Sequence, residues 1–275
     1  MRHLVLVITC FVMMTAWAVR AEALTQFGST QGSFDRTLNV SGSVDLNVTT
    51  GSGTINIRQG SANRVEIHGR IHVGTDWFGS SRNAADTLRQ IEANPPIEQN
   101  GSTIRIGHLD QDIRNVSISY EIVVPANSSI RSHTGSGSQT VTGIEGPVDA
   151  GTGSGSINLT DVRGRVNADT GSGSITATGL RGEFRAQTGS GSIRVDGEQT
   201  GRWEMHTGSG GIDIRLPRSA SFDLNAHTGS GGVTVDFPMT VQGRIDGRRR
   251  DVTGRVGSGG YAMDLRTGSG HIRIE

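Results

Sequence analysis

A hexapeptide, Thr-Gly-Ser-Gly-Ser-Ile, recurs with small changes through most of this 275-residue chain. Between Thr134 and Thr188 the copies follow one another at steps of eighteen residues, and the later steps are irregular. A fixed period of this kind is the signature of stacked repeats. Copies begin at Thr50, Thr134, Thr152, Thr170, Thr188, Thr207, Thr228 and Thr267, and a degenerate one begins at Val256.

Each regular unit contains two short strands and two turns. In residues 152–169, a Gly-Ser-Gly turn precedes a strand ending at Leu159, and a second turn at Gly164 precedes a strand ending at Ala168. Alternate residues are apolar, so each strand has one buried face, which a single unit cannot cover. The sequence therefore predicts an all-β fold, a β-solenoid of the β-helix or β-roll type, whose coils hold about 18 residues each.

The Gly-Ser-Gly segments have a structural explanation as corners. A tight turn needs a positive φ angle or a close approach of two backbones, and glycine permits both. A larger side chain would collide with its copies in adjacent coils, whereas serine and threonine can hydrogen-bond along the stack. The glycines assigned to corners are Gly153, Gly155, Gly171, Gly173, Gly189 and Gly191.

The N-terminus has the pattern of a secretory signal peptide. Arg2 precedes an apolar run over residues 4–19, and a small-x-small cleavage pattern ends at Ala23. Residues 1–23 are therefore predicted to be a signal, with a retained membrane anchor as the alternative. The single cysteine, Cys10, lies inside this segment. The protein is predicted to be exported to the periplasm, the cell surface or the medium.

Residues 24–128 are predicted to form an N-terminal β segment with a helical insertion at about residues 83–93. Residues 24–37 are polar and are expected to be a lead-in to the first strand. Two prolines at 95 and 96 would end the helix. The buried face of this helix would consist of Ala84, Leu88 and Ile91.

Residues 129–275 are predicted to form the repeat solenoid, continuous with the preceding segment. Its later units contain Pro217 and Pro238, and we expect loops inserted at the second corner, on a face that often binds ligands. The chain ends inside a strand at Ile274, and an open solenoid end would permit end-to-end self-association. Three consecutive guanidinium groups could contact an anionic glycan or phosphate, with a solvated loop as the alternative. These candidate ligand contacts are Arg248, Arg249 and Arg250.

Several kinds of site are disfavoured by the sequence. The chain contains no lysine, which a phosphate-binding loop requires, and the repeat lacks the spacing of a nucleophile elbow. The formal net charge is zero, so the composition does not indicate nucleic-acid binding. Calcium-binding solenoid repeats need an aspartate in every turn, where this chain has serine. No cofactor or metal is predicted.

Histidines and carboxylates are the remaining candidates for functional residues. His133, His206 and His227 each precede a copy of the motif, and the latter two are expected in consecutive coils, near enough to share a metal. The same position elsewhere holds Gly, Asp, Gln or Arg, which favours a ladder of surface residues. Clustered carboxylates would suit an enzyme that acts on polysaccharides, but the spacing singles out no pair. The candidates are Asp149, Asp169, Glu183, Asp196 and Glu204.

Residues 116–125, Val-Ser-Ile-Ser-Tyr-Glu-Ile-Val-Val-Pro, are followed by Thr-Gly-Ser-Gly at Thr134 and by a series of similar corners. From Val40 to the C-terminus, this pattern resembles the bacterial putative-adhesin family, a DUF4097-like domain of unknown function in exported or membrane-anchored envelope proteins. The resemblance implies an envelope location and brings no catalytic residues. We therefore expect a non-catalytic adhesin, or a binding or structural module, whose partner is a cell-surface glycan or an envelope protein. A polysaccharide-active enzyme and a self-assembling scaffold are the alternatives.

Overall fold

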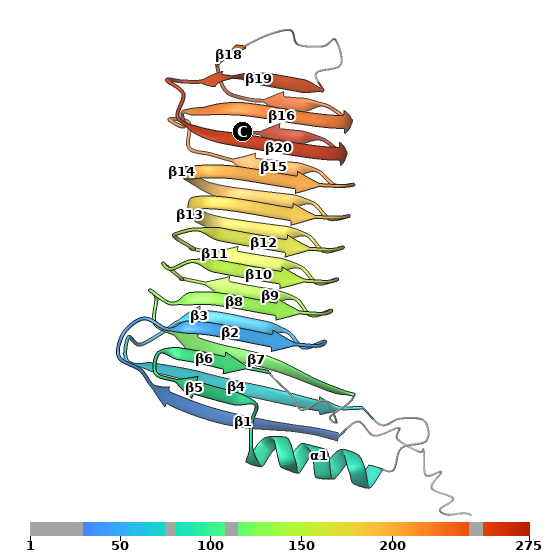
Figure 1. Cartoon of the computed structure of the whole chain (residues 1–275). Coiled ribbons are helices and arrows are strands. Elements are labelled where there is room, and N and C mark those ends of the chain that lie inside the picture. Colours follow the sequence, from blue (N-terminus) through green and yellow to red (C-terminus); the bar gives the residue numbers. More distant parts are fainter. Residues whose placement is uncertain (1–29, 75–80, 108–114, 242–249) are drawn as a thin grey trace, which may run out of the picture.

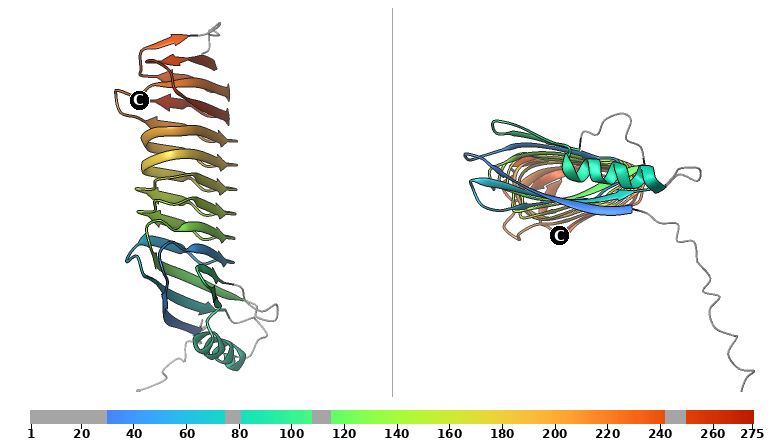
Figure 2. Two further views of the ribbon diagram at one scale, coloured as in Figure 1. Left: turned by 60° about the vertical axis from the view of Figure 1, so that its left-hand side comes forward. Right: turned by 90° about the horizontal axis from the view of Figure 1, so that it is seen from below.

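The computed structural model describes residues 30–74, 81–107, 115–241 and 250–275, so the predicted signal segment lies outside the described residues. The described residues are mainly in β-strands. Hydrogen bonds join 21 strands into one mixed sheet that winds into a flattened column with two faces (Figures 1 and 2). The predicted mainly β chain with one short helix in its N-terminal part is confirmed.

The two faces are defined by strand pairing. Going up the column, the front face consists of β5 (Ile97–Asn100), β6 (Thr103–Ile106), β2 (Asp45–Thr50), β8 (Ser129–Thr134), β10 (Val148–Thr152), β12 (Val166–Thr170), the C-terminal halves of β13 (Ile175–Thr188) and β14 (Ile193–Thr207), β20 (Tyr261–Ser269), β16 (Phe222–Ser230), β19 (Asp251–Val256) and β18 (Met239–Val241). The rear face consists of β1 (Thr30–Asn39), β4 (Arg64–Val73), β7 (Val116–Val124), β3 (Ile55–Gln59), β9 (Gln139–Thr142), β11 (Ile157–Thr160), the N-terminal halves of β13 and β14, β15 (Ile212–Arg215), β21 (Ile272–Ile274) and β17 (Val233–Val235).

In the middle of the column, neighbouring strands are parallel and in the register that the repeat predicts. Val148 pairs with Val166, and Val166 pairs with Phe184, so each coil takes eighteen residues. Side chains from the two faces meet in a thin apolar core, in which Phe184 and Trp203 are fully buried and pack edge to face with ring centroids 6.3 Å apart. Each coil thus covers the apolar side of its neighbours.

The corners combine two kinds of backbone contact. The Thr170 hydroxyl donates to the carbonyl oxygen of Gly155 in the preceding coil at 2.8 Å and accepts from the Gly173 N–H at 3.1 Å. A Cβ atom on Gly173 would lie 1.8 Å from the same Gly155 oxygen. The six assigned corner glycines have no positive φ angle, so close approach of backbones is the reason that glycine is needed here.

At the upper end, the order of coils in space differs from their order in the sequence (Figure 1). The C-terminal strands β20 and β21 lie between the coil of β14 and β15 and the coil of β16 and β17. Residues 216–221 carry the chain past one coil position, which residues 261–274 later fill. The expectation that the chain ends at an open edge is therefore wrong, because Ile274 pairs with Ile214 on one side and Val235 on the other.

At the lower end, too, the order of strands in space differs from their order in the sequence. The coil of β2 and β3 pairs upward with β8 and β9, while the chain first continues downward from it. There β1 pairs antiparallel with β4 along its whole length, so the lead-in expected over residues 24–37 is wrong from Thr30 onward. Its polar sequence conceals the strand, since Phe34 is its one buried residue.

The helix α1 (Ser81–Ala93) packs on β1 and β4, as Figure 1 shows at the base of the column. It begins two residues before the predicted insertion and ends before Pro95. Ala84, Leu88 and Ile91 are buried as predicted. Among the described residues, no helix has the length and apolar character needed to cross a membrane.

Candidate functional site

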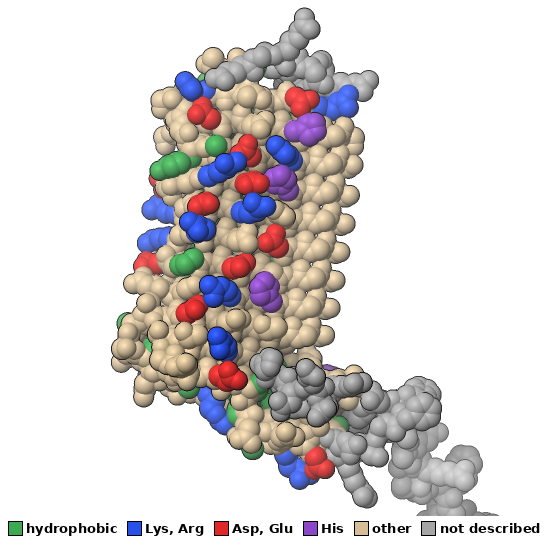
Figure 3. All heavy atoms as spheres, viewed as in Figure 1, with side chains coloured by type: hydrophobic (Ala, Val, Ile, Leu, Met, Phe, Trp, Pro, Cys, Tyr) green, Lys and Arg blue, Asp and Glu red, His purple; other side chains and the backbone are tan. Residues whose placement is uncertain are grey.

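Side chains that point out of the front face form straight columns because the parallel strands are in register (Figure 3). We call the column nearest the Gly-Ser-Gly corners the outer column. It consists of Thr49, His133, Gly151, Asp169, Gln187, His206, Arg266, His227 and Asp251. Beside it runs the middle column, which consists of Asn47, Arg131, Asp149, Asn167, Arg185, Glu204, Asp264 and Asn225.

The three histidines occupy the outer column, yet His206 and His227 are not in consecutive coils. Arg266, from the inserted C-terminal coil, pairs with both and separates them, so this expectation is wrong. His206 Nε2 contacts Glu204 at 3.2 Å, and His227 Nδ1 contacts Asp251 at 2.5 Å. Within the part of the chain that the structure describes, no three His, Cys, Asp or Glu residues gather in a way that could hold a metal ion.

The front face is hollowed by two shallow grooves that adjoin at Asp169 and Gln187. The outer groove, of about 670 Å³, follows the outer column between His133 and His206. Gly151 contributes to this hollow because it places no side chain in the column. A Cβ atom there would lie 2.5 Å from His133 Nδ1, which shows how closely the imidazole covers this glycine.

The middle groove, of about 720 Å³, lies between the middle column and the far corners. Its charged residues have opposite signs in close alternation, as in the pair that Arg165 Nε forms with Glu183 at 3.2 Å. Such a surface offers both donors and acceptors along its length. The charged residues that line it are Arg131, Asp149, Arg165, Asp169, Glu183 and Arg185.

Asp169 stands where the two grooves meet. Partial burial raises the pKa of its carboxyl group, and repulsion from Asp149 raises the pKa further. Three neighbours lower this pKa without cancelling the upward shift. They are Arg185, Asn167 through a hydrogen bond, and His133. Because Asn167 Nδ2 also donates to Asp149 Oδ1 at 3.3 Å, the amide lies between the two carboxylates.

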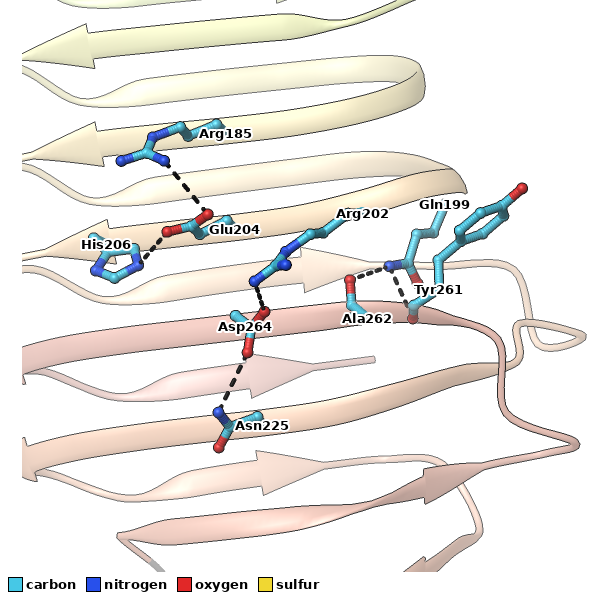
Figure 4. A network of polar contacts seen from close by, with 9 residues as sticks. All are labelled: Arg185, Gln199, Arg202, Glu204, His206, Asn225, Tyr261, Ala262 and Asp264. Atoms are coloured by element: carbon cyan, nitrogen blue, oxygen red, sulfur yellow. Dashed lines mark hydrogen bonds and ion pairs between the residues drawn. The ribbon is translucent and has the colours of Figure 1, made fainter.

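Next to the grooves, polar contacts join side chains of four strands, β13, β14, β20 and β16 (Figure 4). Glu204 contacts Arg185 at 3.5 Å as well as His206. Asp264 accepts from Arg202 at 2.7 Å and from Asn225 at 3.3 Å. The two carboxylates are only 27% and 20% exposed, so these pairs hold the side chains in fixed positions.

The structure brings some of the sequence candidates together and separates others. Of the five carboxylates, Asp196 lies on the rear face, in the N-terminal half of β14, and the other four lie on the front face. Arg248 and Arg249 lie outside the described residues. Arg250 is described, and its Nη1 donates to the Gly229 carbonyl at 3.2 Å, near the upper end of the outer column. The grooves were not predicted from the sequence. Gly151 is a sign of the outer groove, but only after the strand register shows that it lies in a column of larger side chains.

The family model described as Toastrack DUF4097 matches residues 104–275. Similar solved structures include a putative cell adhesion protein of Clostridium sporogenes, with 14% identity, a TM-score of 0.35 and coverage of 89% of this chain and 99% of that chain. A putative adhesin of Bacteroides fragilis has 12% identity, a TM-score of 0.40 and coverage of 89% and 97%. One of Parabacteroides merdae has 8% identity, a TM-score of 0.25 and coverage of 88% and 96%. None of the curated proteins compared with the sequence matches it.

Proposed function

The chain belongs to the Toastrack DUF4097 family, as its sequence resemblance predicts, and we propose that it is an exported, non-catalytic binding module of the cell envelope. In this proposal it acts as an adhesin, and its front face contacts a cell-surface glycan or an envelope protein. Residues 1–23 direct export and are removed. The protein then resides in the periplasm, at the cell surface or in the medium.

One observation carries this proposal, the pair of adjoining grooves on the front face. Their walls are side chains fixed by ion pairs and by the register of the strands, so little ordering is required when a partner binds. Both grooves are broad and open along the column, a shape that suits an extended partner better than a small substrate that must be enclosed.

We also infer that the column is a β-solenoid and that residues 24–128 and 129–275 form one continuous stack. Support comes from the coil of β2 and β3, which lies in the first segment but pairs with β8 and β9 of the second. We also propose that Arg248, Arg249 and Arg250 contact the partner, and Arg250 lies near the upper end of the outer column.

A second function, hydrolysis of polysaccharide, is favoured by one feature. Partial burial raises the pKa of the Asp169 carboxyl group and repulsion from Asp149 raises it further, and a raised pKa favours the protonated form that a general acid needs. Release of reducing ends from envelope polysaccharides, abolished by Asp169→Asn, would support this function over simple binding.

A matched pair of charge reversals tests the binding proposal. Arg185 and Arg194 both form ion pairs at 3.5 Å, with Glu204 and Asp213, but the first pair lies on the front face and the second on the rear. We expect Arg185→Glu to reduce retention of the purified protein on cells and envelope fragments by about tenfold, as at other interface hot spots. Arg194→Glu should leave retention within about twofold. Equal retention of both variants would refute the assignment of the front face.

A further inference from the structure

Tyr261 breaks the alternation that governs the rest of the column. In β20, Met263 and Leu265 are fully buried and Thr267 nearly so, so the same period assigns Tyr261 to the core. Its register partner in β16, Phe222, follows the rule and is fully buried. Tyr261 is instead 56% exposed, and Figure 4 shows its ring projecting away from the strand.

An exposed aromatic ring is unusual on this surface. Among the described residues, the large apolar side chains that are exposed are Tyr261 and Val241. The ring forgoes the favourable free energy of burial that its position in the strand could provide. An exposed tyrosine is well suited to contact a partner, because its rigid ring provides a large contact area at little entropic cost.

The surroundings of the ring are polar and held in place. Gln199 Nε2 donates to the Ala262 carbonyl at 3.0 Å and to the Tyr261 carbonyl at 3.4 Å, which fixes the backbone below the ring (Figure 4). Arg202 is tied to Asp264 at 2.7 Å in the same two strands. Glu198, adjacent to Gln199, pairs with Arg181 at 3.1 Å.

We propose that Tyr261 is the stacking platform of a subsite for a neutral sugar ring, with Gln199 and Arg202 at its rim. This inference rests on the proposed binding function and names the class of ligand. A pyranose has one face of C–H groups that can pack on an aromatic ring, and its edge carries hydroxyl groups that need hydrogen-bond partners. Arg202 has five N–H donors in a fixed fork, and its pairing with Asp264 orients that fork.

The balance of charge favours a neutral sugar over an acidic one. Arg202 is paired with Asp264 in the two strands that Gln199 and Tyr261 occupy, and Arg181 is paired with Glu198, which is adjacent to Gln199. The subsite therefore has no net charge to attract an anion. A peptide is the less suitable ligand, because aromatic recognition of extended peptides uses a groove lined by several rings. Here one ring stands on an open surface, and Val241 is the other exposed large apolar side chain among the described residues.

The test uses the full mature chain and an array of neutral hexose and N-acetylhexosamine oligosaccharides, with titration calorimetry of those that bind. We expect Tyr261→Ala to weaken binding at least tenfold, and Tyr261→Phe and Tyr261→Trp to stay within about threefold of the wild type, since both keep a ring. Val241→Ala is the matched control, because it removes the other exposed apolar side chain, and it should have no effect. Affinity should be the same at low and high salt.

Several outcomes would overturn this subsite. They are unchanged binding by Tyr261→Ala, equal loss in the Val241→Ala control, binding of acidic sugars or peptides in place of neutral sugars, or no sugar binding by the wild type at millimolar concentration. Thermal unfolding checks that each variant is folded. If the wild type is retained on cells but binds no neutral sugar, the subsite fails and the proposed function stands. If it is retained on no surface, the proposed function fails by its own test.

Discussion

Alanine substitutions at three corner glycines should change the stability of the column by different amounts, in an order set by the space around each glycine. A Cβ atom added to Gly51 would have no neighbouring atom within 4 Å. One added to Gly153 would lie 2.5 Å from the carbonyl oxygen of Gly135, and one added to Gly173 would lie 1.8 Å from the carbonyl oxygen of Gly155. Gly51 and Gly153 occupy the same place in the repeat, so they differ in what lies below them rather than in the local sequence.

The size of the effect follows from these distances. Relieving the contact at Gly173 requires the two coils to separate by more than an ångström, which would lengthen the hydrogen bond that the Thr170 hydroxyl donates to the Gly155 carbonyl oxygen. Overpacking costs about 1 to 3 kcal/mol and a lost hydrogen bond about 1 kcal/mol, while the reduced freedom of the unfolded chain returns about 0.4 to 1 kcal/mol. We expect Gly173→Ala to lose about 2 to 3 kcal/mol, Gly153→Ala about 1 kcal/mol, and Gly51→Ala nothing or a slight gain.

Urea unfolding followed by circular dichroism would measure the three variants against the wild type. Because stacked repeats can unfold in parts, hydrogen exchange at the substituted coil and at its neighbours should accompany the midpoints. The loss of protection should be greatest in the coils on either side of Gly173. If Gly51→Ala and Gly173→Ala unfold at the same urea concentration, close backbone approach is not the reason for glycine at the corners.

Two further predictions concern the C-terminal strand and the grooves. Removal of residues 271–275 should lower the free energy of unfolding, measured in urea, by about 3 to 6 kcal/mol, because Ile272 and Ile274 are fully buried. If the loss is as small as that caused by Glu275→Gln, β21 does not occupy an interior position. Since the folded state raises the pKa of Asp169 above its ordinary value of 3.8, the protonated form is favoured by folding and stability falls as the pH rises through the raised pKa. The Asp169→Asn variant should therefore unfold at a higher temperature than the wild type at neutral pH and lose this advantage below about pH 3.8. A lower melting temperature of the variant at neutral pH would show that folding does not raise the pKa of Asp169.

Much of the architecture was predictable because the repeat is a local signal. Eighteen-residue spacing, alternation and a glycine corner all lie within one unit, and the observed register of Val148 with Val166 follows from them. The apolar face of α1 was predictable for the same reason, since Ala84, Leu88 and Ile91 lie within two helical turns. In each case the residues that determine the structure are neighbours in the sequence.

The errors all involve partners that are distant in the sequence. β1 has one buried residue, Phe34, and becomes a strand through its pairing with β4 more than twenty residues away. The position of β21 is set by β15 and β17, which leave a gap of one coil between them. The irregular repeat spacing after Thr188 was a signal of this gap, but spacing alone does not say which later segment fills it.

The contrast between local and distant determinants also explains which positions of this fold can recognise a partner. Thr170 and Gly173 are repeated in coil after coil because each bonds to, or must closely approach, the coil below. Residues in those positions cannot vary without breaking the stack, so they cannot encode a preference for one partner over another. Outward positions carry no such constraint, and there the chain places Gly151 and Asp169. Tyr261 departs from its inward position and is exposed to solvent as well. Their neighbours in space are set by the stacking order, in which Arg266 separates His206 from His227, so a binding surface on this protein has to be identified from the order of coils in the column.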